Sequence, residues 1–165
     1  MNIIYNNLCK LTIDLQLHRD QGKKIGLVNG TFNIIKPDHI DLFLYTKSLC
    51  DILIVGVNNE SFLKRNNKKT IYSSSDRACI INNIKSVDYV LVGPSSGCNE
   101  WNNEILELCP DILVKGINYT IDDVEGGEKE ACERVGCKLY IMNKNNSSSV
   151  YFNDIKHVVP KVNWR

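Results

Sequence analysis

Five short apolar runs stand out along the chain, each made of Ile, Val, Leu or Tyr and closed by Gly or Asn. Continuous apolar runs of this length are typical of parallel β-strands that are buried on both faces. We therefore predict strands at residues 24–30, 51–58, 88–93, 111–116 and 138–143.

Segments with helical spacing alternate with these runs. In the first of them, 39–49, the spacing puts Ile40, Phe43 and Leu44 on one side. Further helices are predicted at 75–85, 101–108, 125–135 and 147–155, with a leading helix within 4–21. Alternating strands and helices require right-handed crossovers. The pattern predicts an α/β fold: a Rossmann-like, doubly wound, five-stranded parallel sheet with helices on both faces.

Length and composition narrow the class of protein. The 165 residues are enough for one domain, predicted to span 1–165, and the chain is 43% hydrophobic and 24% charged, as in globular proteins. The formal net charge of +1 gives no global field to attract nucleic acid or an anionic membrane. No stretch approaches the ~20 apolar residues of a membrane-spanning helix, and the N-terminus does not resemble a signal peptide. We expect a cytoplasmic protein.

The seven cysteines form no C-x-x-C pair. Five of them lie inside apolar or helical patterns and are predicted to be buried thiols, which suits a reducing cytosol: Cys9, Cys50, Cys79, Cys109 and Cys132. Cys132 and Cys137 could be two metal ligands, but no histidine or further cysteine pair completes a set. We predict no metal site formed by the protein alone.

The loops that follow the strands are the expected ligand site, because doubly wound sheets bind ligands at the carboxyl ends of their strands. These loops are 29–39, 57–69, 115–119 and 143–149. They offer glycine and asparagine backbone, lysines and three consecutive serines, all of which suit phosphate groups.

The first of these loops reads NGTFNIIKPDH. Gly30 permits a sharp turn and close approach of a ligand, and Thr31 and Phe32 then present backbone N–H groups. Pro37 fits the first position of a helix. His39 falls in the first helical turn, where the helix dipole favours anions. From this spacing, His39 either holds a phosphate or merely caps and packs.

Several stretches resemble the cytidylyltransferase-like nucleotidyltransferases. GTFNIIKPDH is similar to the signature G-[TC]-F-D-x-x-H-x-G-H, and LCDILIVGVNNESF to L-G-D-x-L-I-V-G-V-N-S-D. SSSDRACIINNIKSVDYVLV resembles a segment that opens E-D-R. The stretch from DILVKGINY to CKLYIM resembles the heptose-phosphate adenylyltransferase branch, and NNSSSVYFNDI its closing S-T-T turn. The resemblance runs in order over roughly residues 5 to 156.

The resemblance implies a reaction. Such enzymes join a nucleoside triphosphate to a phosphorylated alcohol or sugar and release pyrophosphate, without a covalent enzyme intermediate. Positioning and charge stabilisation then supply most of the catalysis, with Mg²⁺ bridging phosphates. We expect ATP as the nucleotide and a heptose-1-phosphate-like acceptor. Such proteins commonly form homodimers, and the same is expected here.

The resemblance also implies roles for residues of the signature. His39 matches the second histidine, which contacts the triphosphate, and Lys36 stands in place of the first. Thr31 and Phe32 match backbone donors near the α-phosphate. Lys47 matches a basic position that faces the acceptor phosphate, or is an ordinary solvated lysine.

Other expected ligands lie on the later loops. Lys115 matches the lysine of the family's V-K-G-G-D-Y stretch and is expected to meet an anion. Arg77 matches the E-D-R arginine and binds substrate or is structural, and Asn58 faces the nucleotide or ends its strand. The remaining expected nucleotide-binding residues are Asn29, Gly30, Ser147, Ser148 and Ser149.

Two departures from the signature keep other functions open. Lys36 replaces a histidine but preserves a cation, whereas Asp38 replaces a glycine and adds a negative charge beside the expected triphosphate. Asp38 could instead be the helix N-cap and point away. The alternatives are a cytidylyltransferase that uses CTP and a polyol or amino-alcohol phosphate, and a non-catalytic nucleotide-binding homologue.

Overall fold

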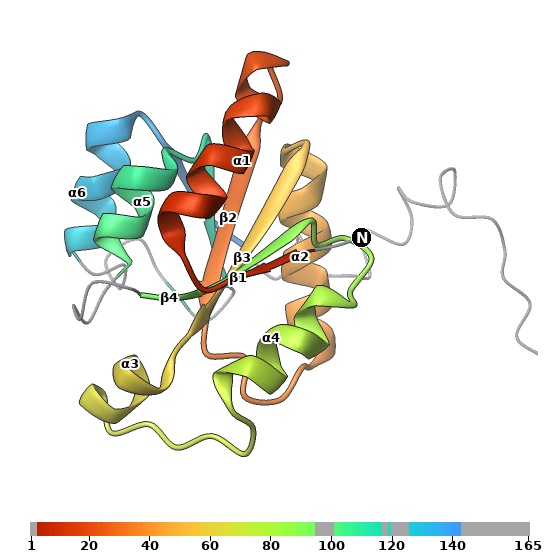
Figure 1. The fold of residues 1–165 in the computed structure, drawn as a ribbon, viewed down its shortest axis with the longest axis vertical. Helices are drawn as coiled ribbons and strands as arrows, with labels where there is room; N and C mark the ends of the chain where they lie inside the picture. Colours follow the sequence, from red (N-terminus) through yellow and green to blue (C-terminus); the bar gives the residue numbers. More distant parts are fainter. Residues whose placement is uncertain (1–2, 95–100, 117–118, 120–125, 143–165) are drawn as a thin grey trace, which may run out of the picture.

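A computed structural model describes residues 3–94, 101–116, 119 and 126–142. Strands and helices alternate along the chain, as the apolar pattern predicts (Figure 1). The strands are β1 (Ile3–Tyr5), β2 (Ile25–Gly30), β3 (Ile52–Asn58), β4 (Tyr89–Gly93), β5 (Ile112–Lys115) and β6 (Lys138–Ile141). The helices are α1 (Leu8–Asp20), α2 (Pro37–Leu49), α3 (Glu60–Arg65), α4 (Ser74–Asn82), α5 (Asn102–Leu108) and α6 (Gly126–Val135).

The strands form one parallel sheet in the order β1-β4-β3-β2-β5-β6. The α/β, doubly wound architecture is confirmed, but the described sheet has six strands rather than five. The extra strand is β1, which pairs with β4 at one edge of the sheet. The leading helix was therefore predicted to begin too early, because three strand residues are too few to stand out beside a helical pattern.

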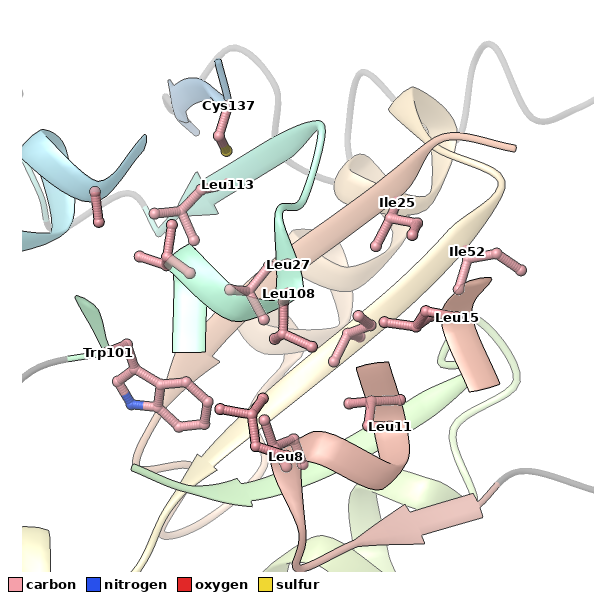
Figure 2. Packing of buried hydrophobic residues seen from close by; sticks show 14 of the residues in the cluster. Leu8, Leu11, Leu15, Ile25, Leu27, Ile52, Trp101, Leu108, Leu113 and Cys137 are labelled. Atoms are coloured by element: carbon pink, nitrogen blue, oxygen red, sulfur yellow. The ribbon is translucent and has the colours of Figure 1, made fainter. Parts of the chain in front are cut away.

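The helices cover both faces of the sheet. Helices α1, α5 and α6 pack on one face, and α2 and α4 pack on the other (Figure 1). Successive strand residues point to opposite faces, so Ile52 and Ile54 join the first cluster while Leu53 and Val55 join the second. Figure 2 shows the first cluster, in which leucines of α1 meet strand residues beneath them. The sheet's central strands are thus buried on both sides.

One helix of the structure was not apparent from the apolar pattern. Helix α3 lies beyond the carboxyl end of β3 and was not predicted, since six residues give little periodicity (Figure 1).

Cys9, Cys79 and Cys109 are exposed, so the prediction that they are buried is wrong. Cys9 and Cys79 lie on the solvent side of α1 and α4, and Cys109 is the C-cap that follows α5. No helix within the described residues is long and apolar enough to cross a membrane.

Candidate active site

A cavity of about 450 Å³ opens at the carboxyl ends of β2 and β5. It lies at the point where strand order reverses, since β3 and β5 flank β2 on its two sides, and doubly wound folds bind ligands there. The cavity is lined by the turn after β2, the first turn of α2, and residues at the ends of β5 and β6. The lining residues are Asn29, Gly30, Thr31, Phe32, Asn33, Ile34, Lys36, Asp38, His39, Leu42, Lys115, Gly116, Tyr119 and Met142.

The turn after β2 has an unusual backbone at Phe32. Phe32 adopts a left-handed conformation with φ of 49°, which is uncommon for a residue with a side chain. Its ring is buried and packs edge-on against His39 and Phe43, each with centroids 5.3 Å apart. A Cβ on Gly30 would lie 3.0 Å from that ring, closer than an ordinary contact, so a side chain there would require the ring to shift. The turn is thus held rigidly against α2.

Buried polar side chains hold the same turn in place through hydrogen bonds. Arg77 is 1% exposed and donates to the backbone oxygens of Thr31 (2.5 Å) and Asn58 (2.8 Å). The Asn58 amide donates to the Thr31 hydroxyl at 3.1 Å and accepts from the indole N–H of Trp101 at 2.7 Å. Neither Arg77 nor Asn58 is among the residues that line the cavity. Of the alternatives that the sequence left open for these two residues, their contacts favour support, because Arg77 donates to backbone carbonyls and the Asn58 amide bonds the side chains of Thr31 and Trp101.

His39 lies on the wall of the cavity in the first turn of α2. Its Nδ1 accepts the backbone N–H of Lys36 at 3.2 Å, so the neutral imidazole carries its proton on Nε2. Burial lowers the pKa of His39, the positive charge of Lys36 lowers it further, and Asp38 acts in the opposite direction. His39 is therefore a neutral N–H donor at neutral pH. The capping and packing that the sequence offered as one alternative are found, and His39 also lines the cavity.

Lys36 and Asp38, two of the departures from the family signature, also line the cavity. Lys36 is the N-cap of α2, and its carbonyl accepts the backbone N–H of His39 at 2.9 Å. Asp38 is exposed and lies within the first helical turn. The alternative that Asp38 is the N-cap is therefore wrong. Its charge instead lies on the cavity wall, beside that of Lys36.

Lys115 lies at the end of β5 and is 6% exposed. Its ammonium donates to the Asn29 side-chain oxygen at 2.9 Å and forms an ion pair with Glu128 of α6. The Asn29 amide in turn donates to the other oxygen of Glu128 at 2.7 Å. The Lys115 ammonium also lies 5.7 Å from the centre of the Tyr119 ring. Three elements thus meet in one buried polar cluster at the cavity.

Glu128 is a residue that the sequence analysis missed. A signal for it existed: Glu128 shares the spacing of the buried Ala131 and Cys132, which places a carboxylate on the apolar face of α6. A charge on such a face needs a buried partner. Tyr119 and Met142 also line the cavity unpredicted. Ser147, Ser148 and Ser149 lie outside the described residues.

Lys47 lies far from the cavity, in the last turn of α2 and eight residues beyond His39. That separation is about 12 Å along the helix axis. Its ammonium contacts the Asp88 carboxylate and the Asp51 carbonyl, both at 2.5 Å, and these two aspartates precede β4 and β3. The prediction that Lys47 faces the acceptor phosphate is wrong, because the lysine lies at the amino edge of the sheet.

Replacing Lys47 with methionine is therefore expected to leave kcat and the KM for both substrates unchanged. The ion pair that is removed is partly exposed, with 31% and 33% of the two side chains accessible, so the free energy of unfolding should fall by about 1 kcal/mol or less. Steady-state kinetics and urea unfolding measure both quantities. A selective rise in the KM for the acceptor would restore Lys47 to the site.

Residues 27–158 match the model of the cytidylyltransferase-like family. Among curated proteins, the chain is 37% identical over 121 residues to the bifunctional protein HldE of Helicobacter pylori strain HPAG1, a match covering 72% of this chain and 25% of that protein. It is 35% identical over 112 residues to HldE of Paramagnetospirillum magneticum, covering 67% and 22%. The matches thus span about a quarter of the length of these relatives.

Solved structures show the same fold. A lipopolysaccharide core biosynthesis protein from Thermoplasma volcanium superposes with a TM-score of 0.63 at 25% identity, covering 74% of this chain and 98% of that one. Pantoate-beta-alanine ligase from Francisella tularensis superposes with a TM-score of 0.60 at 18% identity, covering 87% and 67%, which concerns the fold alone. The family match, together with the cavity at the β2 turn, leads to one conclusion: the chain belongs to the cytidylyltransferase-like family of nucleotidyltransferase enzymes.

Proposed function

We propose that this chain transfers AMP from ATP to a sugar phosphate resembling heptose-1-phosphate and releases pyrophosphate. One observation carries the proposal: His39 of α2 and Lys115 of β5, two cationic or N–H-donating side chains from separate elements, line the same cavity as the turn after β2. A triphosphate lying across this turn and the amino end of α2 would meet backbone N–H groups and a favourable helix dipole.

In the proposed reaction, an oxygen of the acceptor phosphate attacks the α-phosphorus of ATP. A new P–O bond forms to the acceptor, the bond from the α-phosphorus to the β-bridging oxygen breaks, and its electron pair leaves with pyrophosphate. No protein nucleophile is needed, because a phosphate monoester is already an anion. The proposed role of the Nε2–H of His39 is to donate to the triphosphate oxygens as negative charge shifts toward the leaving group.

The residues present fit a magnesium ion that arrives with the nucleotide. Mg²⁺ commonly binds through one or two carboxylates together with substrate phosphates. Among the described residues that line the cavity, Asp38 is the one carboxylate. Asp38 would hold the ion, which supplies neutralisation of the triphosphate charge. With the ion bound, the Asp38 carboxylate, which would otherwise repel the triphosphate, would contribute to nucleotide binding.

The choice of ATP and of a sugar phosphate rests on the resemblance of VKG and the following segment to heptose-phosphate adenylyltransferases. A solved relative is described as a lipopolysaccharide core biosynthesis protein, and a saccharide product is in keeping with a sugar-phosphate acceptor. CTP with a polyol or amino-alcohol phosphate remains the second candidate. The third candidate is a nucleotide-binding protein without turnover, which applies if Asp38 repels the triphosphate instead of holding the ion. A homodimer and a cytoplasmic location are part of the proposal.

The proposal is tested with ATP, CTP, GTP and UTP, each with Mg²⁺, in a thermal-shift panel. A ligand at 100 times its Kd adds about 2.7 kcal/mol of stability, which raises the melting temperature measurably. We expect ATP to give the largest shift, and pyrophosphate release to follow when sugar phosphates are added. A largest shift with CTP would select the second candidate. Nucleotide binding without pyrophosphate release across the acceptor panel would favour the third.

The decrease of kcat/KM at low pH should follow the protonation of His39. Because its pKa lies below 6.5, activity should fall only as the pH drops below that value and Nδ1 becomes protonated, which breaks the bond from the Lys36 N–H. Lys36→Met removes a cation that lowers the pKa of His39, so the acid limb of kcat/KM should move to higher pH. Asp38→Asn removes an anion that raises it, so the limb should move to lower pH.

Measurement of kcat/KM against pH for the three proteins checks both directions. The substrate phosphates titrate identically in all three, so a difference between variants belongs to the protein. Shifts of the same sign in both variants, or an unmoved limb, would show that His39 does not control the acid limb.

A further inference from the structure

We propose that Glu128 is a positioning residue that holds Lys115 and Asn29 in place for the bound nucleotide. The inference rests on the proposed function and adds to it a residue on α6, outside the turns that carry the family signature. Glu128 is not among the residues that line the cavity, so it acts through the two that do.

The interactions of Glu128 form a closed ring. Its Oε1 accepts the Asn29 amide at 2.7 Å, its Oε2 is paired with the Lys115 ammonium, and that ammonium donates to the Asn29 oxygen at 2.9 Å. The three residues come from α6, β2 and β5. Register explains why they meet: β2 and β5 pair Gly26 with Ile112, and continuing the pairing sets Asn29 opposite Lys115. Glu128 then spans the two strand ends.

Burial makes the carboxylate necessary to this arrangement. The side chains of Lys115 and Glu128 are only 7% and 8% exposed, so either charge alone would be poorly solvated. A buried charge that loses its partner is strongly unfavourable. The carboxylate therefore permits an ammonium group to stay at a dry position beside the cavity. A lysine without this partner would turn toward solvent or lose its fixed direction.

The ring also leaves Lys115 able to meet a phosphate. An ammonium group has three N–H donors, and Asn29 and Glu128 accept two of them. We assign the third N–H donor of Lys115 to a phosphate oxygen of the bound nucleotide. Asn29 contributes in the same way: its oxygen and its amide are both engaged by the ring, so its side chain has one fixed orientation at the exit of β2.

The opposite role for Glu128, competition with the incoming anion, is less well supported by the geometry. A competing carboxylate would be expected to contact Lys115 alone and to swing into solvent when displaced. Glu128 instead uses both oxygens, for two different residues, and is buried. Displacing it would break two interactions and leave its charge without a partner. The two roles predict opposite changes in nucleotide affinity.

The test is a double-mutant cycle on the full chain, with MgATP as the probe and its Kd measured by calorimetry. The proteins are wild type, Glu128→Gln, Lys115→Met, the double variant, and Glu130→Gln as a control. Glu130 is an exposed carboxylate on the same helix. We expect Glu128→Gln and Lys115→Met each to weaken MgATP binding at least about 10-fold, as removing a charge-assisted contact does. The double variant should bind no more weakly than Lys115→Met, and Glu130→Gln should match wild type.

A non-additive cycle distinguishes positioning from a general structural effect, because a structural defect would persist in the Lys115→Met background. Wild-type affinity in Glu128→Gln, additive losses, or tighter binding would each overturn the inference while leaving the proposed function intact. Absence of MgATP binding by the wild-type chain would overturn both. If Glu128→Gln does not fold, Glu128→Asp is tested in its place. Its carboxylate is one methylene shorter, so MgATP binding should weaken several-fold. Wild-type affinity in Glu128→Asp would overturn the inference.

Discussion

Replacing His39 with alanine is expected to lower kcat for pyrophosphate release by about 10²- to 10³-fold, the usual effect of removing one donor to a developing negative charge. The structure supports this expectation in a specific form. His39 lines the cavity as a neutral imidazole whose Nδ1 is occupied by the Lys36 N–H, so its remaining donor is the Nε2–H. Alanine has no donor to offer in its place.

The fold should survive this change. His39 is half-buried, and its replacement by alanine removes one capping hydrogen bond and the edge-on packing against the Phe32 ring. Removing a cap costs about 1 kcal/mol of unfolding free energy, a modest fraction of the stability of a domain. Urea unfolding and steady-state pyrophosphate release separate the two effects. Activity should therefore fall far more than stability does.

Two companion variants sharpen the His39 experiment. His39→Gln keeps an N–H donor near the position of Nε2 and should recover part of the rate. His18→Gln is the matched control, because His18 lies on α1, bonds to the Tyr89 hydroxyl at 2.8 Å and does not line the cavity, so its replacement should leave kcat unchanged. Wild-type turnover by a folded His39→Ala protein would remove His39 from the mechanism.

Replacing Arg77 with methionine is expected to lower the free energy of unfolding by about 3 to 5 kcal/mol. Arg77 donates to three backbone carbonyls, those of Thr31 (2.5 Å), Asn58 (2.8 Å) and Tyr72 (3.2 Å). A buried acceptor left without a donor costs about 1–3 kcal/mol; the bond to Asn58 is buried and the other two are partly buried, and the three costs are not fully additive. Methionine fills much of the volume but supplies no donor, so the carbonyls lose their partners.

The same variant should also weaken nucleotide binding. Arg77 holds the Thr31 carbonyl and so fixes the turn that carries the left-handed Phe32. In protein that is still folded at low temperature, MgATP affinity is therefore expected to fall, although Arg77 itself is not among the cavity-lining residues. Arg134→Met, at an exposed position of α6, is the control and should change neither quantity by a measurable amount. Unchanged MgATP affinity in folded Arg77→Met would show that the turn keeps its shape without the arginine.

The sequence by itself determined the layered α/β fold, five of the described strands and the loop that carries the cavity. Strands buried on both faces leave continuous apolar runs, and such runs can be read without knowledge of their neighbours. His39 was found for a similar reason. Proline two residues before it and glycine at the strand exit are local signals, and both depend only on backbone conformations that neighbouring residues impose.

Only the tertiary structure decided which charged residues belong to the site. Lys47 lies on the same helix as His39, but its position eight residues further along α2 puts it with Asp88 at the amino edge of the sheet. Arg77 and Glu128 are far from the cavity turn in sequence, and both are brought to it by the packing of a helix on the sheet. The partner of a buried charge depends on which elements pack together, and sequence spacing within one element carries no information about that.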